Sequence, residues 1–198
     1  MLEILKNTIY KNDEVIVINK KDIFNIHGKN KKSLTYVFKR KKIRYFLVHR
    51  IDKYTSGIII VSRGKFISKK INEKFKDKRI KKYYIAILKG IPRKKIGFID
   101  SILDDKTNIS STYYKLLGQC KCVYSLVEFC PLTGKKHQIR VHATFLKCKV
   151  LGDNKYNTFS NKYYDYDMIK LHSYKYFFIL RNILYKIVAK LPKLFKIK

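Results

Sequence analysis

Acidic side chains are scarce in this chain, and the shortage points to a polyanionic partner. The 198 residues include 14 aspartates and glutamates against 46 lysines and arginines, a formal net charge of +32. Self-repulsion of that size destabilises a folded protein unless a polyanion neutralises it. Nucleic acid is the first candidate, because lysine and arginine release counterions when they neutralise phosphates. An anionic membrane surface is the second candidate, and a general bias toward lysine is the simpler explanation.

The sequence also lacks long hydrophobic runs and a secretory leader. No apolar stretch reaches the ~18 residues that a membrane-spanning helix needs. The richest region, 174–191, is interrupted by Lys175, Arg181, Lys186 and Lys190. The first ten residues contain no leader-like apolar core, so we expect a cytoplasmic protein whose four cysteines stay reduced.

The cysteines do not have the spacing of a metal site. Cys120 and Cys122 are separated by one residue, closer than the usual zinc pair, and Cys130 and Cys148 do not form a matched second pair. His137 and His142 are five residues apart and lack the glutamate that accompanies a zinc-binding histidine pair. We therefore expect no structural or catalytic metal.

The order of predicted elements favours an α+β fold. A length of 198 residues suits a single domain, which we place over 1–198. Strands outnumber helices and do not alternate as βαβ units, so the sheet should be mixed and largely antiparallel, with flanking helices and loops. We expect strands near 14–18, 58–61, 82–89, 112–117, 123–129, 171–180 and 183–189, and helices following Ser33 and over 65–78 and 136–147.

The strongest local signal is the surroundings of Asp52. This carboxylate stands between Arg50 and Lys53, just before a Thr55-Ser56-Gly57 turn and an apolar strand. Neighbouring cations favour an ionised carboxylate, and a turn at a strand end can hold it for chemistry. An aspartate that only caps the turn is the structural alternative.

Four segments in order resemble the RluA-type pseudouridine synthases, in particular their branch acting on large-subunit ribosomal RNA. His49-Arg50-Ile51-Asp52 with Thr55-Ser56-Gly57 is similar to the family's HRLDxxTSG, and Lys82 to Ala86 with Gly90 is similar to its K-x-Y-x-A strand. Thr133 to His142, followed by Gly152-Asp153 and Tyr156, is similar to TGRTHQIRVH with GDxxY. Leu171-His172-Ser173 with Val188 to Pro192 is similar to the family's C-terminal pattern. The resemblance implies the pseudouridine synthase catalytic fold and the isomerisation of uridine in RNA.

The resemblance implies three catalytic residues, Asp52, Arg140 and Tyr84. Asp52 would be the carboxylate that acts as nucleophile or general base. Arg140 would hold that carboxylate ionised through a bidentate contact; the alternative is an arginine on a solvated helix face. Tyr84 would stack on the flipped uracil, although 16 tyrosines make a packing role plausible and Tyr83 is adjacent.

The same resemblance suggests substrate-binding roles for Arg50, Leu171 and His49. Arg50 would share the Asp52 face of an extended segment and contact a phosphate. Leu171 would pack beneath the base, or be an ordinary core leucine. His49 is grouped with them, although a structural role suits it better.

Two departures from the family pattern affect these expectations. The usual Lys-Pro pair after the first strand is replaced by Lys20-Lys21, and the following Gly is missing, which predicts a looser loop. Too few residues precede Val48 for the αL-type N-terminal RNA-binding module, so we expect the basic surface to bind RNA instead.

The expected enzyme is a monomer without a cofactor, because the reaction is an isomerisation. Its partner would be RNA, with ribosomal RNA preferred and transfer RNA possible, and no membrane. A non-catalytic basic RNA-binding or assembly protein with the same fold is the alternative.

Overall fold

The computed structural model describes residues 3–29, 33–103, 109–121, 123–156 and 168–195. Cys122 lies outside the described residues. The chain divides into two compact units, Met1–Lys81 with Ser173–Lys190 (unit 1), and Lys82–His172 with Leu191–Lys198 (unit 2). We describe each unit by itself.

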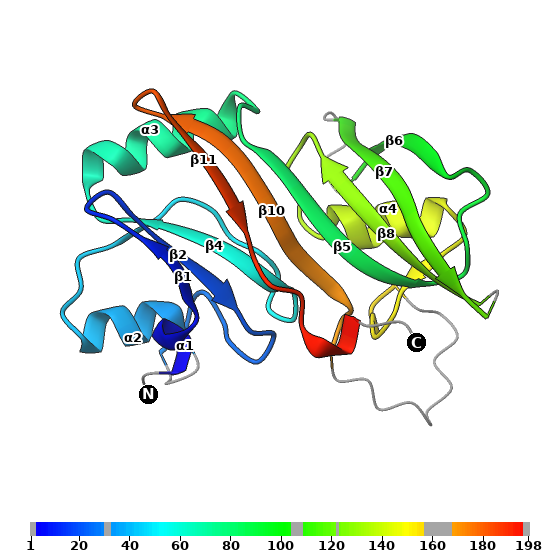
Figure 1. Cartoon of the computed structure of the whole chain (residues 1–198), viewed down its shortest axis with the longest axis horizontal. Helices are drawn as coiled ribbons and strands as arrows, with labels where there is room; N and C mark the ends of the chain where they lie inside the picture. The colour runs from blue at the N-terminus through cyan, green and yellow to red at the C-terminus, as the bar shows by residue number, and fades with distance from the viewer. Residues whose placement is uncertain (1–2, 30–32, 104–108, 122, 157–167, 196–198) are drawn as a thin grey trace. The chain divides into compact units, whose positions relative to one another are not determined.

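Unit 1 is built from short antiparallel strand pairs with helices beside them (Figure 1). β2 pairs with β1 and β4, β4 also pairs with β3, and β10 pairs with β11. The bounds are α1 (Glu3–Lys6), β1 (Thr8–Lys11), β2 (Val15–Lys20), α2 (Leu34–Arg40), β3 (Phe46–Leu47), β4 (Ser56–Ser62), α3 (Lys65–Lys76), β10 (Leu171–Leu180) and β11 (Ile183–Val188).

The core of unit 1 follows from hydrophobic patterning. All seven residues of β4 are buried, as its continuous apolar run predicts. Ser33 caps α2 as expected, because its hydroxyl accepts the backbone N–H of Tyr36 at 3.4 Å. α3 buries Ile67 and Ile71 in this core. The neighbouring Phe66, although apolar, lies outside this core, because 63% of it is exposed.

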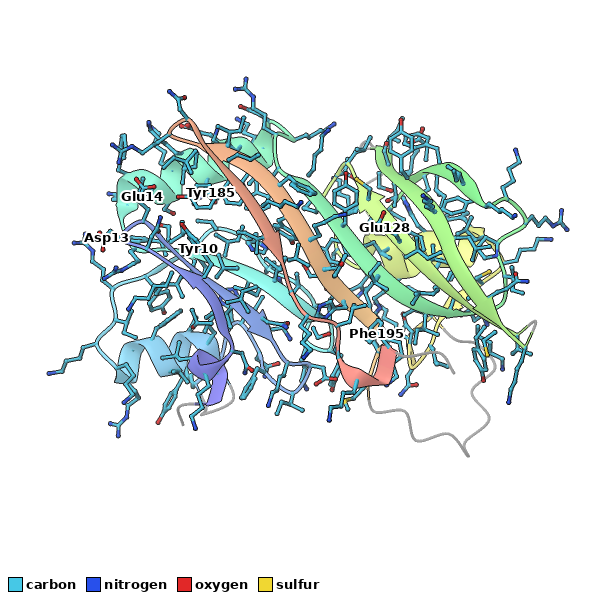
Figure 2. The ribbon with its side chains drawn as sticks, in the orientation of Figure 1. Tyr10, Asp13, Glu14, Glu128, Tyr185 and Phe195 are labelled. Carbon is cyan, nitrogen blue, oxygen red and sulfur yellow. The ribbon has the colours of Figure 1, made fainter. Side chains whose placement is uncertain are left out.

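Polar and aromatic contacts join the β1–β2 hairpin to the β10–β11 hairpin. The rings of Tyr10 and Tyr185 meet edge to face at 5.8 Å, and the Asn12 amide donates to the Tyr185 hydroxyl at 3.1 Å. Arg181 donates to the Glu14 carboxylate at 2.7 Å. Figure 2 labels Tyr10, Glu14 and Tyr185. These contacts bring the last strands of unit 1 against its first ones.

Unit 2 contains four strands in the order β5-β8-β7-β6, in which β6, β7 and β8 form a meander and β5 pairs with β8, with β9 also paired to β5. Its strand pairs are antiparallel. The bounds are β5 (Lys81–Lys89), β6 (Ile96–Ile102), β7 (Ile109–Cys120), β8 (Tyr124–Pro131), α4 (Gln138–Phe145), β9 (Lys149–Val150) and the 3-10 helix η1 (Lys193–Phe195). The prediction of an α+β fold with a largely antiparallel sheet is therefore confirmed.

Unit 2 differs from the sequence-based prediction at two places. The strand predicted over 112–117 does not end at Gly118, which lies within β7 at a register shift, and the chain turns after Cys120. β6 was not predicted, because only Ile99 of its seven residues is buried and the apolar pattern is weak.

α4 covers one face of the unit 2 sheet through Ile139 and Ala143 (Figure 1). The helix is shorter than the predicted 136–147, because His137 and Lys147 adopt left-handed backbone angles of φ 57° and 56° on either side of it. Phe145, expected to be buried, is 58% exposed.

Candidate active site

Asp52 lies in an irregular segment that leads into β4. The flanking Val48 and Ile51 are buried, whereas Asp52 is half-buried, and its carbonyl accepts the Thr55 N–H at 3.2 Å. Gly57 follows at φ 107°, and a Cβ there would lie 2.1 Å from the Ser173 carbonyl oxygen. Only glycine permits this close approach, so the Thr-Ser-Gly sequence fixes the turn that presents Asp52.

Arg50 and His49 occupy different environments beside Asp52. Residues 48–52 form no strand, and Arg50 is exposed. The face that Arg50 is expected to share with Asp52 and its substrate-binding role stay predictions. His49 Nε2 accepts the Ile60 N–H at 2.8 Å, and its ring lies 5.0 Å from Phe75 and 5.5 Å from Tyr176. These contacts within unit 1 favour the structural alternative for His49.

Lys20 supports the Asp52 turn from β2, a role that sequence reasoning missed. Its side chain is buried, and its Nζ donates to the carbonyl oxygens of Phe24 and Lys53 at 2.8 Å and of Lys21 at 3.1 Å. Three acceptors match the three donors of an ammonium group. These three hydrogen bonds anchor the loop after β2. They also place the Lys20 amine beside the carbonyl of Lys53, the residue that follows Asp52.

Burial lowers the pKa of Lys20 from 10.5 to about 7, while the carboxylates of Asp22 and Asp52 act in the opposite direction. In the unfolded chain the amine returns to its ordinary pKa. Between about pH 7 and 10.5 the unfolded state therefore binds more protons than the folded state. Wild-type stability gains from this group as the pH rises through that window.

We expect Lys20→Met to remove this pH dependence. The difference in unfolding free energy between wild type and variant should grow in favour of wild type from pH 7 to 10, with a slope of up to about 1.4 kcal/mol per pH unit. Urea unfolding of both proteins across this range measures it. A difference that stays constant with pH would show that Lys20 does not titrate there.

In unit 2, Gln138 fastens the start of α4 to the sheet. Its Oε1 accepts the Thr133 hydroxyl at 2.8 Å and the Lys135 N–H at 3.0 Å. Its Nε2 donates to the Ser111 carbonyl at 3.0 Å and to the Thr112 hydroxyl at 2.9 Å. A buried amide with partners on both ends holds its neighbours rigidly. This explains the Thr-Gly-x-x-His-Gln spacing before the helix.

Arg140, on the first turn of α4, makes a bidentate pair with Asp153. Its Nε and Nη2 each donate to one carboxylate oxygen at 2.7 Å, and both side chains are buried. The guanidinium also lies 5.0 Å from the Tyr156 ring, whose hydroxyl is 2.9 Å from His137 Nδ1. The two parallel hydrogen bonds to Asp153 and the contact with the Tyr156 ring together fix the plane of the Arg140 guanidinium.

The expected pairing of Arg140 with Asp52 stays a prediction, because the two residues belong to different compact units. Sequence reasoning did not assign a partner role to Asp153, although the Gly-Asp-x-x-Tyr motif contains it. Asp153 Oδ1 also accepts the N–H groups of Lys155 at 3.0 Å and Tyr156 at 3.3 Å. The motif thus forms a turn that presents its carboxylate to Arg140.

Strand alternation separates Tyr84 from Tyr83. Tyr84 packs against the cluster that includes Phe129 and the α4 residue Ile139, so it lies on the α4 side of the sheet. Tyr83 faces the other side, where burial chiefly, with contributions from Cys130 and Glu128, raises the pKa of its phenol. Tyr84 therefore lies on the same side of the sheet as α4, and its stacking on the uracil stays a prediction beside the packing role.

Leu171 lies in the same buried cluster as Ile139 and Phe129, where it contributes to packing, and its contact with the base stays a prediction.

Lys82, at the start of β5, donates to the Thr133 carbonyl at 2.9 Å. Burial lowers the pKa of Lys82 from 10.5 to about 8. This lysine links β5 to the loop before α4, a support that the motif match did not explain.

His142 is a buried neutral histidine. Its Nε2 lies 2.9 Å from the Ser110 hydroxyl and 3.0 Å from that of Ser101, and burial lowers its pKa from 6.5 to about 4.

Among the described residues, no three His, Cys, Asp or Glu side chains group as metal ligands. No helix in the described part of the chain is long and apolar enough to cross a membrane.

Comparison with known proteins identifies the family of this chain. A family model described as RNA pseudouridylate synthase matches residues 14–144. Ribosomal large subunit pseudouridine synthase C of Rickettsia typhi is 34% identical over 93% of this chain and 67% of its own length. Synthase D of Borreliella burgdorferi is 33% identical over 96% of the chain and 66% of its own length. The chain thus spans about two thirds of these relatives.

A solved structure has the same fold. Human RNA pseudouridylate synthase domain containing 4 superimposes with a TM-score of 0.83, covering 98% of this chain and 91% of that chain at 24% identity.

Proposed function

Because this chain belongs to the RNA pseudouridylate synthase family, we propose that it converts specific uridines of large-subunit ribosomal RNA to pseudouridine with Asp52 as the catalytic carboxylate. The enzyme class, RNA pseudouridine synthase, follows from the family. The choice of large-subunit RNA is supported by the names of the relatives from Rickettsia typhi and Borreliella burgdorferi.

The reaction requires one bond to break and another to form within the same nucleotide. The C1′–N1 bond is cleaved, the uracil turns, a C1′–C5 bond forms, and the proton on C5 is transferred to N1. No atom is gained or lost, so no cofactor is needed. A carboxylate can serve by attack on the base, by attack at C1′, or by removing the proton from C2′, and each route needs Asp52 ionised.

The observation that carries this proposal is the way Asp52 is presented. Buried Val48 and Ile51 anchor the chain before it, the Gly57 approach to Ser173 holds the turn after it, and Lys20 binds the adjacent carbonyl of Lys53. A surface carboxylate with no chemical role has no need of such support.

Arg140 and Tyr84 are the other two residues that we propose to be catalytic. Arg140 is held by Asp153 in a fixed plane, which suits a guanidinium that must orient a second anion. Tyr84 would stack on the extruded uracil, and its position on the α4 side of the sheet supports this assignment. Arg50 would contact a phosphate. The whole chain 1–198 would act as one catalytic domain, as a monomer in the cytoplasm without a membrane.

We expect Tyr84→Ala to lower the rate of pseudouridine formation by roughly tenfold or more, because base stacking is lost. Tyr83→Ala is the matched control on the opposite face and should retain most activity. Single-turnover rates on the same RNA, with thermal unfolding to check folding, distinguish the two. An inactive Tyr83→Ala beside a normal Tyr84→Ala would reverse the register.

Pseudouridine mapping tests the function directly. Unmodified large-subunit ribosomal RNA, small-subunit ribosomal RNA and transfer RNA would each be incubated with the protein and sequenced for new pseudouridines. We expect new sites in large-subunit RNA. Sites confined to transfer RNA would change the substrate, and tight RNA binding without product in any RNA would favour a non-catalytic RNA-binding protein.

A further inference from the structure

α3 presents a hollow of about 760 Å³ along its side. Its described wall is formed by Lys65, Phe66, Ser68, Lys69, Asn72, Glu73 and Lys76. Three of these residues are lysines and one is a glutamate, so the wall carries a net positive charge. Lys65, Lys69 and Lys76 are all exposed.

The spacing of these lysines suits an extended polyanion. Positions 65, 69, 72 and 76 recur on one face of a helix. With a rise of ~1.5 Å per residue, Lys65 and Lys76 are roughly 16 Å apart along the axis, enough to follow several phosphates of one strand. The exposed Asn72 adds a hydrogen-bonding side chain between them, and its amide donates to the buried Ser68 hydroxyl at 3.5 Å.

Phe66 gives the same face an aromatic ring. Its side chain lines the hollow and is 63% exposed, and the Lys70 ammonium lies 4.6 Å from the ring centroid. A solvated ring beside basic groups is the combination with which proteins bind unpaired nucleotides, through base stacking and phosphate contacts.

A membrane surface fits the same face poorly. A helix that lies on a bilayer needs a continuous apolar face to insert. The apolar residues Ile67 and Ile71 of α3 are instead buried in the core of unit 1.

We propose that this α3 face, defined by Lys65, Phe66, Lys69 and Lys76, binds the RNA substrate outside the reacting uridine. The three lysines contact backbone phosphates, and Phe66 stacks on an unpaired base. This inference rests on the proposed function for the identity of the RNA. It assigns to unit 1 a binding surface that none of the family motifs includes.

The test compares two neutralised variants with equal charge. In the first, Lys65, Lys69 and Lys76 are changed to Gln. In the matched control, the exposed Lys11, Lys39 and Lys41 of the same unit are changed to Gln. The dissociation constant for unmodified large-subunit ribosomal RNA would be measured over a range of salt concentrations.

We expect the α3 variant to reduce the slope of log affinity against log salt by about 2, because three phosphate contacts of a single strand are lost. The control should change the slope far less. Phe66→Ala should weaken binding by roughly tenfold with the slope unchanged. For the α3 variant, kcat at saturating RNA should stay at the wild-type value while KM rises.

Equal slopes for the α3 variant and its control would overturn the inference. So would an α3 variant that loses binding to anionic vesicles while its RNA binding is unchanged. These binding results are independent of turnover. Wild-type protein that binds RNA but forms no pseudouridine would contradict the proposed function alone, and the slopes would still decide the role of α3.

Discussion

Asp52→Asn should abolish pseudouridine formation, with a loss on the order of 10³-fold or more in single-turnover rate. Asparagine keeps the size and the hydrogen-bonding capacity of the side chain. It removes the negative charge that all three chemical routes require. The half-buried turn around Asp52 should therefore persist, because its backbone contacts to Thr55 and to Lys20 do not use the carboxylate.

The measurement is pseudouridine mapping together with RNA affinity for wild type and variant. Asp13→Asn is the control, because it removes one negative charge from a fully exposed carboxylate in the same unit, labelled in Figure 2. We expect normal RNA binding for both variants and normal activity for Asp13→Asn. Undiminished turnover by Asp52→Asn would show that this carboxylate is not the catalytic one.

Arg140→Lys should lower activity by about 10²-fold while the protein still folds. Lysine keeps the positive charge but cannot donate two parallel hydrogen bonds from a plane. The bidentate contact with Asp153 and the orientation over Tyr156 would be lost, so a group aimed at the reacting nucleotide would no longer be preorganised. Single-turnover kinetics and thermal unfolding measure the two effects separately.

Asp153→Ala should lower stability strongly and should also lower the activity of the folded molecules, because it removes the carboxylate that fixes the plane of Arg140. It leaves the buried Arg140 guanidinium without its carboxylate and the N–H groups of Lys155 and Tyr156 without their acceptor. Breaking a buried pair in this way costs about 3–5 kcal/mol, which corresponds to a fall in Tm of roughly 10 °C. If Arg140→Lys lost as much stability as Asp153→Ala while its folded molecules were as active as wild type, Arg140 would have only a structural role.

The stability of the Asp52 turn also depends on contacts that a motif does not display. Lys20 is not part of the motif around Asp52, yet its Nζ donates a hydrogen bond to the carbonyl oxygen of Lys53, 33 residues further along the chain. The Lys-Pro departure therefore predicts the wrong consequence. A missing proline suggests a loose loop, whereas the three carbonyl acceptors of Lys20 hold that loop in place.

The amino-acid sequence by itself determined the family, the strands with continuous apolar runs and the residues with unusual chemistry. β4 and α2 are local: an apolar run and a capping serine specify them without reference to distant residues. Asp52, Arg140 and Tyr84 could be named because a short motif keeps their spacing. The register of the K-x-Y-x-A match favours Tyr84 over Tyr83, and strand alternation, itself a local rule, predicts that only one of the two faces the substrate.

Only the tertiary structure decided which groups those residues contact. The pairing of Arg140 with Asp153, the clamp of Gln138 on β7 and the anchoring of Lys20 join atoms that are distant in sequence. The exposure of Phe66 likewise depends on which side of α3 the core occupies. The physical reason is that backbone carbonyls are alike in every residue, so a side chain's acceptor and its burial are set by where the folded chain places them.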